Sequence, residues 1–68
     1  MKYMETYYNA QIEGSIYKLD NGKVSLVYHY YGNTAMKVTY DSPFEAIKAL
    51  RKLTDHKLFS MHGTAVVE

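Results

Sequence analysis

The residue types that could perform chemistry in this 68-residue chain are three histidines, seven carboxylates and eight tyrosines. His29, His56 and His62 do not form an HxH, HxxxH or HExxH motif, so the chain has no local zinc-binding pattern. The carboxylates are scattered, and the sequence contains neither a Ser/His/Asp set nor a glycine-rich phosphate loop. These patterns predict a protein that is not an enzyme and that has no catalytic residues, metal site or cofactor.

The composition excludes several classes of protein. The chain has no cysteine, 47% apolar residues and a formal net charge of +1. A disulfide framework is therefore excluded, and the apolar fraction is too high for a disordered chain. No apolar run approaches the roughly 18 residues of a membrane span, and the near-neutral charge creates no strong field for nucleic acid or membrane. We expect one cytoplasmic domain over residues 1–68, without membrane contact.

An alternating pattern from Tyr7 to Tyr40 predicts antiparallel strands, because side chains alternate between the two faces of a sheet. A three-residue loop at 20–22 keeps the apolar even positions on one face and pairs Ile16 with Leu26. The second break, at 31–33, similarly places Leu26 opposite Val38. The pattern predicts a three-stranded meander with strands at about 7–19, 23–30 and 34–40. Gly14 is expected to mark a bulge or a bend in the long first strand.

A helix start is signalled by Ser42-Pro43-Phe44-Glu45, which fits a capping box with proline in the first turn. The helix is expected over about 43–55, with Phe44, Ile47, Leu50 and Leu53 in its apolar stripe. The sheet and the stripe must cover each other, which predicts an α+β fold with the helix on the even face. The tail at 57–68 is compatible with a short fourth strand beside the first or third strand.

The odd positions of the predicted sheet form a second, outer face that carries tyrosines. This face is either an ordinary solvated surface or a contact surface, since tyrosine is enriched both in strands and at interfaces. The second interpretation predicts a small non-enzymatic module that binds another protein through this face or through an edge strand. Its candidate contact residues are Tyr7, Tyr17, Leu19, Val27, His29 and Tyr31. A weaker interpretation makes the same face a homodimer interface.

The order of three strands and a helix resembles the AP2 domain and the arm-binding N-terminal domains of phage and transposon integrases. The resemblance lies in the segments 14–17, 22–26 and 38–47, where a strand ending in Tyr40-Asp41 leads into a helix that begins with Glu45-Ala46. It implies that the outer sheet face enters the DNA major groove. The alternative function is therefore nucleic-acid binding, through residues that match that face: Tyr17, Lys23, Ser25, His29 and Lys37. The family's strands are rich in arginine and tryptophan, which this sheet lacks.

The size and near-neutral composition of the chain resemble those of small accessory or inhibitor proteins of phages and mobile elements, including anti-defence proteins. This resemblance implies a protein partner in the host cytoplasm.

Overall fold

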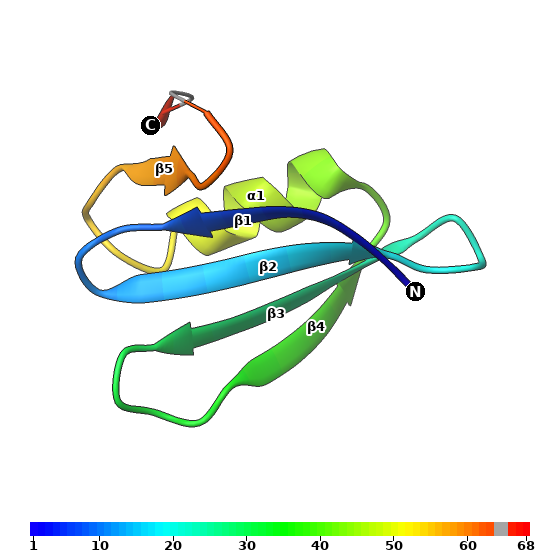
Figure 1. Ribbon diagram of the computed structural model, residues 1–68, viewed down its shortest axis with the longest axis horizontal. Helices are drawn as coiled ribbons and strands as arrows, with labels where there is room; N and C mark the ends of the chain where they lie inside the picture. The colour runs from blue at the N-terminus through cyan, green and yellow to red at the C-terminus, as the bar shows by residue number, and fades with distance from the viewer. Residues whose placement is uncertain (64–65) are drawn as a thin grey trace.

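The computed structural model describes residues 1–63 and 66–68, and these residues form one helix and a six-stranded antiparallel sheet (Figure 1). The strand order is β4-β3-β2-β1-β5-β6. The α+β class with an antiparallel sheet is confirmed, but the expected three or four strands are too few. In chain order the elements are β1 (Lys2–Tyr8), β2 (Ile12–Lys18), β3 (Val24–Tyr30), β4 (Met36–Tyr40), α1 (Pro43–Arg51), β5 (Leu58–Ser60) and β6 (Val66–Val67).

The prediction of one long strand over 7–19 is wrong, because this segment folds into a hairpin of β1 and β2. The turn between them is built by a side chain. Asn9 Oδ1 accepts hydrogen bonds from the main-chain N–H groups of Gln11, at 2.7 Å, and Ile12, at 3.0 Å. An asparagine side chain can replace a main-chain turn in this way without glycine or proline.

Because of this hairpin, the residues before the turn lie on the opposite face of the sheet from the one that the alternating pattern predicts. Tyr7 lies opposite Gly14 and packs at the edge of the core, whereas Tyr8 lies opposite Glu13 on the other face. The expected outer position of Tyr7 is therefore wrong. A bulge does occur in this pair of strands, but it lies between Tyr3 and Glu5 in β1 and not at Gly14.

The registers predicted for the next two strand pairs are confirmed. Ile16 lies opposite Leu26, and Leu26 lies opposite Val38. The loop at 20–22 also has the expected form, since Gly22 has a φ of +87° and its N–H donates to Leu19 O at 3.1 Å. The last strand of the meander begins at Met36 rather than at residue 34.

The helix begins as predicted and ends earlier. Ser42 Oγ accepts the N–H of Glu45 at 3.3 Å, which caps the helix N-terminus. The helix ends at Arg51 rather than near residue 55, and Arg51 then donates to the carbonyl oxygen of Thr54 at 2.9 Å. Helix and sheet together bury Ile12, Ile16, Val24, Leu26, Ala46, Leu50 and Leu58. Phe44, expected in this stripe, is 70% exposed.

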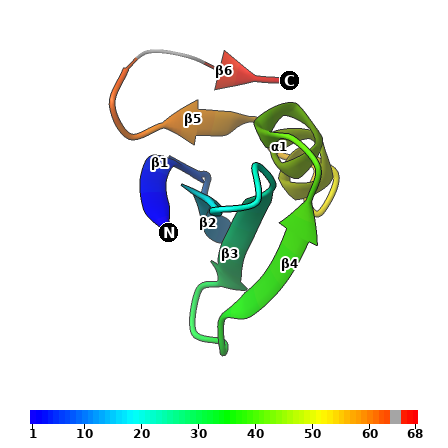
Figure 2. The same ribbon diagram turned by 90° about the vertical axis from the view of Figure 1, so that its right-hand side faces the viewer.

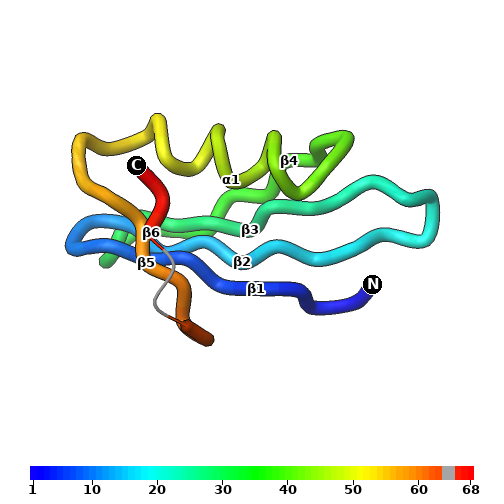
Figure 3. The backbone as a smooth tube through the Cα atoms, turned by 90° about the horizontal axis from the view of Figure 1, so that it is seen from above, coloured from blue at the N-terminus to red at the C-terminus, as the bar shows by residue number. Residues whose placement is uncertain are grey.

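The tail contains strands, and of the two positions left open, beside the first or the third strand, the structure has the first. β5 pairs with β1, and the two-residue strand β6 pairs with β5. Figure 2 shows that the sheet curls, so that its two edge strands, β4 and β6, lie on either side of α1. Figure 3 shows the helix axis running along the long strands rather than across them. Among the described residues, no helix is long and apolar enough to cross a membrane.

Candidate interaction surface

The face of the sheet that points away from α1, here called the outer face, is the convex side of the curled sheet (Figure 2). The strand registers arrange its residues in three rows across the sheet. The rows are Tyr3, Tyr17, Ser25 and Thr39; Thr6, Ser15, Val27 and Lys37; and Phe59, Tyr8, Glu13 and His29. Tyr31 follows β3 and contacts the His29 ring.

Aromatic rings on this face contact one another in pairs. The centroids of Tyr3 and Tyr17 are 5.8 Å apart, and those of Tyr8 and Phe59 are 5.9 Å apart. The rings of His29 and Tyr31 meet edge to face at 5.7 Å. Such pairs restrict the rings while leaving them partly accessible, and 43% of Tyr3 and 47% of Tyr31 remain exposed. The outer face therefore presents aromatic area in a fixed arrangement.

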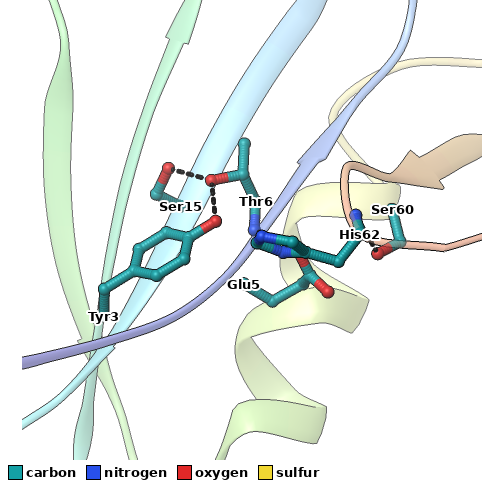
Figure 4. Close-up of polar contacts among 6 residues, drawn as sticks. All are labelled: Tyr3, Glu5, Thr6, Ser15, Ser60 and His62. Carbon is teal, nitrogen blue, oxygen red and sulfur yellow. Dashed lines mark hydrogen bonds and ion pairs between the residues drawn. The ribbon is translucent and has the colours of Figure 1, made fainter.

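Hydroxyl groups hold one end of the outer face together (Figure 4). A hydrogen bond of 2.7 Å joins Tyr3 Oη to Thr6 Oγ1, and a second of 2.8 Å joins Thr6 Oγ1 to Ser15 Oγ. Thr6, at the centre of this network, is only 9% exposed. It orients the Tyr3 ring against Tyr17.

The outer face carries little net charge. Glu13 and His29, which lie opposite each other, form a contact of 3.4 Å between Oε1 and Nε2. Lys37 is the single lysine or arginine in the three rows. Lys23 lies in the loop before β3, where its Nζ is 3.4 Å from Asp41 Oδ1.

A second group of side chains joins the tail to β1 (Figure 4). His62 Nδ1 donates to Glu5 Oε1 at 2.7 Å, and the same oxygen accepts the N–H of Thr6 at 2.9 Å. The hydrogen bond from His62 is the main cause of a lowered pKa at Glu5. Ser60 stands beside this pair and accepts the main-chain N–H of His62 at 3.3 Å.

This group has the residue types of a catalytic triad but not its arrangement. A nucleophilic serine must hydrogen-bond the histidine ring nitrogen that is not bound to the carboxylate. Ser60 Oγ instead accepts the main-chain N–H of His62. The group is therefore a clamp between distant parts of the chain. The clamp depends on residues 57 positions apart, which no sequence motif connects.

The structure brings together four of the six residues predicted as partner contacts: Tyr17, Val27, His29 and Tyr31. Leu19 lies beyond the end of β2 and is half-buried, and Tyr7 is on the other face. Tyr3, Tyr8 and Phe59 are outer-face residues that sequence reasoning missed. The turn at Asn9 was the signal that would have placed Tyr8 there.

The residues predicted to contact nucleic acid are less well grouped on the outer face than those predicted to contact a protein. Tyr17, His29 and Lys37 share the outer face. Ser25 lies there too, but it is fully buried and its Oγ has no hydrogen-bond partner among the described residues. A buried hydroxyl cannot reach a base edge, so the expected contact role of Ser25 does not fit the fold.

Comparison with protein-family models, with curated proteins and with solved structures finds no match to this chain. The resemblance to AP2 and integrase arm-binding domains therefore stays a prediction.

Proposed function

We propose that this protein is a small binding module that engages another protein through its outer face. The observation that supports the proposal is the gathering of four tyrosines and a phenylalanine on the sheet face opposite the helix. These residues come from four separate segments of the chain: Tyr3 and Tyr8, Tyr17, Tyr31, and Phe59.

The restricted conformations of these rings suit a contact surface. Tyrosine contributes a large contact area for the loss of few rotatable bonds, and it is enriched among the residues that dominate binding energy. Ring pairs and the hydroxyl network already restrict Tyr3, Tyr17 and Tyr8 in the unbound protein. Ordering these side chains on binding therefore costs less than it would on a flexible surface.

The charges favour a protein partner over nucleic acid. A nucleic-acid surface needs several lysines or arginines to neutralise phosphates. The rows of the outer face contain Lys37 alone, and Lys23 already faces Asp41. The further proposal that the module is an accessory or inhibitor protein of a phage or mobile element rests on size and composition alone.

The proposal is tested by affinity capture from an extract of the source cells, with and without nuclease. Tyr31→Ala and Phe59→Ala remove exposed outer-face rings, whereas Phe44→Ala removes a 70% exposed ring on α1 as the matched control. We expect the two outer-face variants to lose a protein that the wild type and Phe44→Ala retain, with or without nuclease. Capture that disappears with nuclease, and that falls steeply with salt and in a Lys23→Ala/Lys37→Ala variant, would instead support nucleic-acid binding.

A further inference from the structure

Asn21 and Gly22 form the exposed tip of the loop between β2 and β3. In such a pair the main-chain nitrogen of the glycine can attack the side-chain amide carbon of the asparagine, because the glycine has no side chain to obstruct the approach. The attack closes a five-membered succinimide ring and releases ammonia. The pair belongs neither to the outer face nor to the clamp between Glu5 and His62.

The side chain of Asn21 is folded back over the glycine. Its Oδ1 accepts the main-chain N–H of Lys23 at 2.9 Å, which is the hydrogen bond of an Asx turn. Because this bond spans Gly22, it brings the amide carbon of Asn21 toward the nitrogen of Gly22. The same bond draws electron density from the amide carbon, which is therefore both positioned and polarised for attack in the folded protein.

The loop offers little resistance to the reaction. The N–H of Gly22 donates to Leu19 O at 3.1 Å, and this hydrogen bond must break before the nitrogen can attack. The net value of such a bond at an exposed loop is small, because water replaces the lost partner. Gly22 has a φ of +87°, and nothing lies within 4 Å of the position that its Cβ would take, so it can rotate without a clash.

The other two asparagines of the chain lack this combination. Asn9 is only 5% exposed, and its side chain is held by the turn that it closes and by Thr54. Asn33 is exposed, but the next residue is Thr34, whose branched side chain crowds the nitrogen that would have to attack. The reaction is therefore expected at Asn21 alone.

We propose that Asn21 is a site of spontaneous deamidation that yields chiefly isoaspartate. The nitrogen of Gly22 bonds to Cγ of Asn21, its proton passes to the amide nitrogen, and ammonia leaves. Water then opens the succinimide, with its hydroxyl going to a carbonyl carbon and its proton to the ring nitrogen. Cleavage at the original main-chain carbonyl leaves the chain linked through Cγ as isoaspartate, whereas cleavage at Cγ gives aspartate.

Either product changes the loop between β2 and β3. A neutral amide becomes a carboxylate, so the formal net charge falls from +1 to 0. The new charge lies beside Lys23, whose Nζ is 3.4 Å from Asp41 Oδ1. Isoaspartate also lengthens the main chain by one bond before Gly22, which should disturb the hydrogen bond from Leu19 N to Lys23 O. The inference does not depend on the proposed function.

Intact mass and peptide mapping test the proposal on the folded protein. Mildly alkaline buffer is used because the attacking nitrogen must lose its proton. We expect a gain of about one dalton at Asn21, with isoaspartate exceeding aspartate, and no gain at Asn33. Asn21→Gln is the matched control, since it keeps an amide in the loop but would have to close a less favourable six-membered ring. Its mass should stay constant over the same time.

The wild type in guanidinium chloride is the unfolded reference. Conversion of Asn21 only in guanidinium chloride would overturn the proposal, because the folded loop would then protect the amide, and so would no conversion in either condition. An equal gain in Asn21→Gln would place the reaction at another residue. Aspartate without isoaspartate would exclude the succinimide, and each of these two results also overturns the proposal.

Discussion

Gly14 occupies a position where the sheet and the helix approach too closely for a side chain. A Cβ atom there would lie 2.8 Å from Leu50 Cδ2 and 3.1 Å from Tyr28 Cβ. Since Leu50 is fully buried and has little room to move, we expect Gly14→Ala to lower the free energy of unfolding by about 1–3 kcal/mol. Urea denaturation measures the change. Gly63→Ala, where nothing lies within 4 Å, is the control, and an equal effect at both glycines would contradict this explanation.

The hydrogen bond between Glu5 and His62 makes one contribution to stability dependent on pH. His62 lowers the pKa of Glu5 below the ordinary value of a glutamate. The pKa of Glu5 is lower in the folded protein than in the unfolded protein. The stabilisation from this hydrogen bond is therefore complete above the ordinary pKa of a glutamate, and it is lost as the pH falls through the pKa that Glu5 has in the folded protein.

We expect His62→Ala to raise the pKa of Glu5 toward its ordinary value, since the main cause of the shift is removed. An NMR titration of the Glu5 carboxyl carbon measures this change. His56→Ala, which removes an exposed histidine between α1 and β5, should leave the pKa of Glu5 where it is. An unchanged pKa in His62→Ala would show that the clamp does not form in solution.

At the scale of the elements, α1 buries a narrower stripe than its sequence indicates. Ala46 and Leu50 are fully buried, but Phe44 at the first turn is 70% exposed. Phe44 stands in the first turn of α1 beside the end of β4, where it lines a surface groove with Tyr40 and Asp41. The stripe predicts which side of the helix faces the sheet, and the sheet decides how much of that side is covered.

The two apolar positions should therefore differ in their contribution to stability. Leu50→Ala removes a fully buried side chain and should lower the free energy of unfolding by about 2–5 kcal/mol. Phe44→Ala changes an exposed side chain and should alter it by no more than about 0.5 kcal/mol. Thermal and urea unfolding of both variants measure the difference. A large loss for Phe44→Ala would mean that this ring is covered in solution.

At the scale of the whole molecule, Asn9 connects parts of the chain that are far apart in sequence. Its side chain closes the turn between β1 and β2, and its Nδ2 donates to Thr54 Oγ1 at 2.8 Å and to His56 O at 3.4 Å. Asn9 is only 5% exposed. It therefore ties the first hairpin to the segment that leads from α1 into β5.

Asn9→Ala should lower the free energy of unfolding by about 1–3 kcal/mol, because buried donors and acceptors lose their partners. Asn33→Ala, which changes an exposed asparagine in the loop before β4, is the control and should have little effect. Urea unfolding measures both. Equal effects at the two positions would show that Asn9 does not hold the hairpin to the segment after α1.

The eight tyrosines divide equally between the two faces of the sheet. Tyr3, Tyr8, Tyr17 and Tyr31 belong to the outer face, and Tyr7, Tyr28, Tyr30 and Tyr40 pack at the edge of the core. The core set lets a small domain cover its apolar residues with side chains whose hydroxyl groups reach water. The outer set is the basis of the proposed function.

Local patterns in the sequence determined much of this fold. The alternation from Ile12 to Tyr40 set the register of β2, β3 and β4, because a slip by one residue would expose the whole core face. The glycine in the loop at 20–22 and the cap at Ser42 were also predictable, since each depends on residues within a few positions of one another. Four of the predicted contact residues reached the outer face for the same reason.

Tertiary structure decided most of the rest. The turn at Asn9 is closed by local hydrogen bonds to Gln11 and Ile12, and its side chain is held in addition by Thr54, 45 positions later. The place of β5 beside β1, and with it Phe59 beside Tyr8, depends on the helix returning the chain to the first strand. These contacts join residues whose separation exceeds any local pattern, so their geometry exists only once the whole chain has folded.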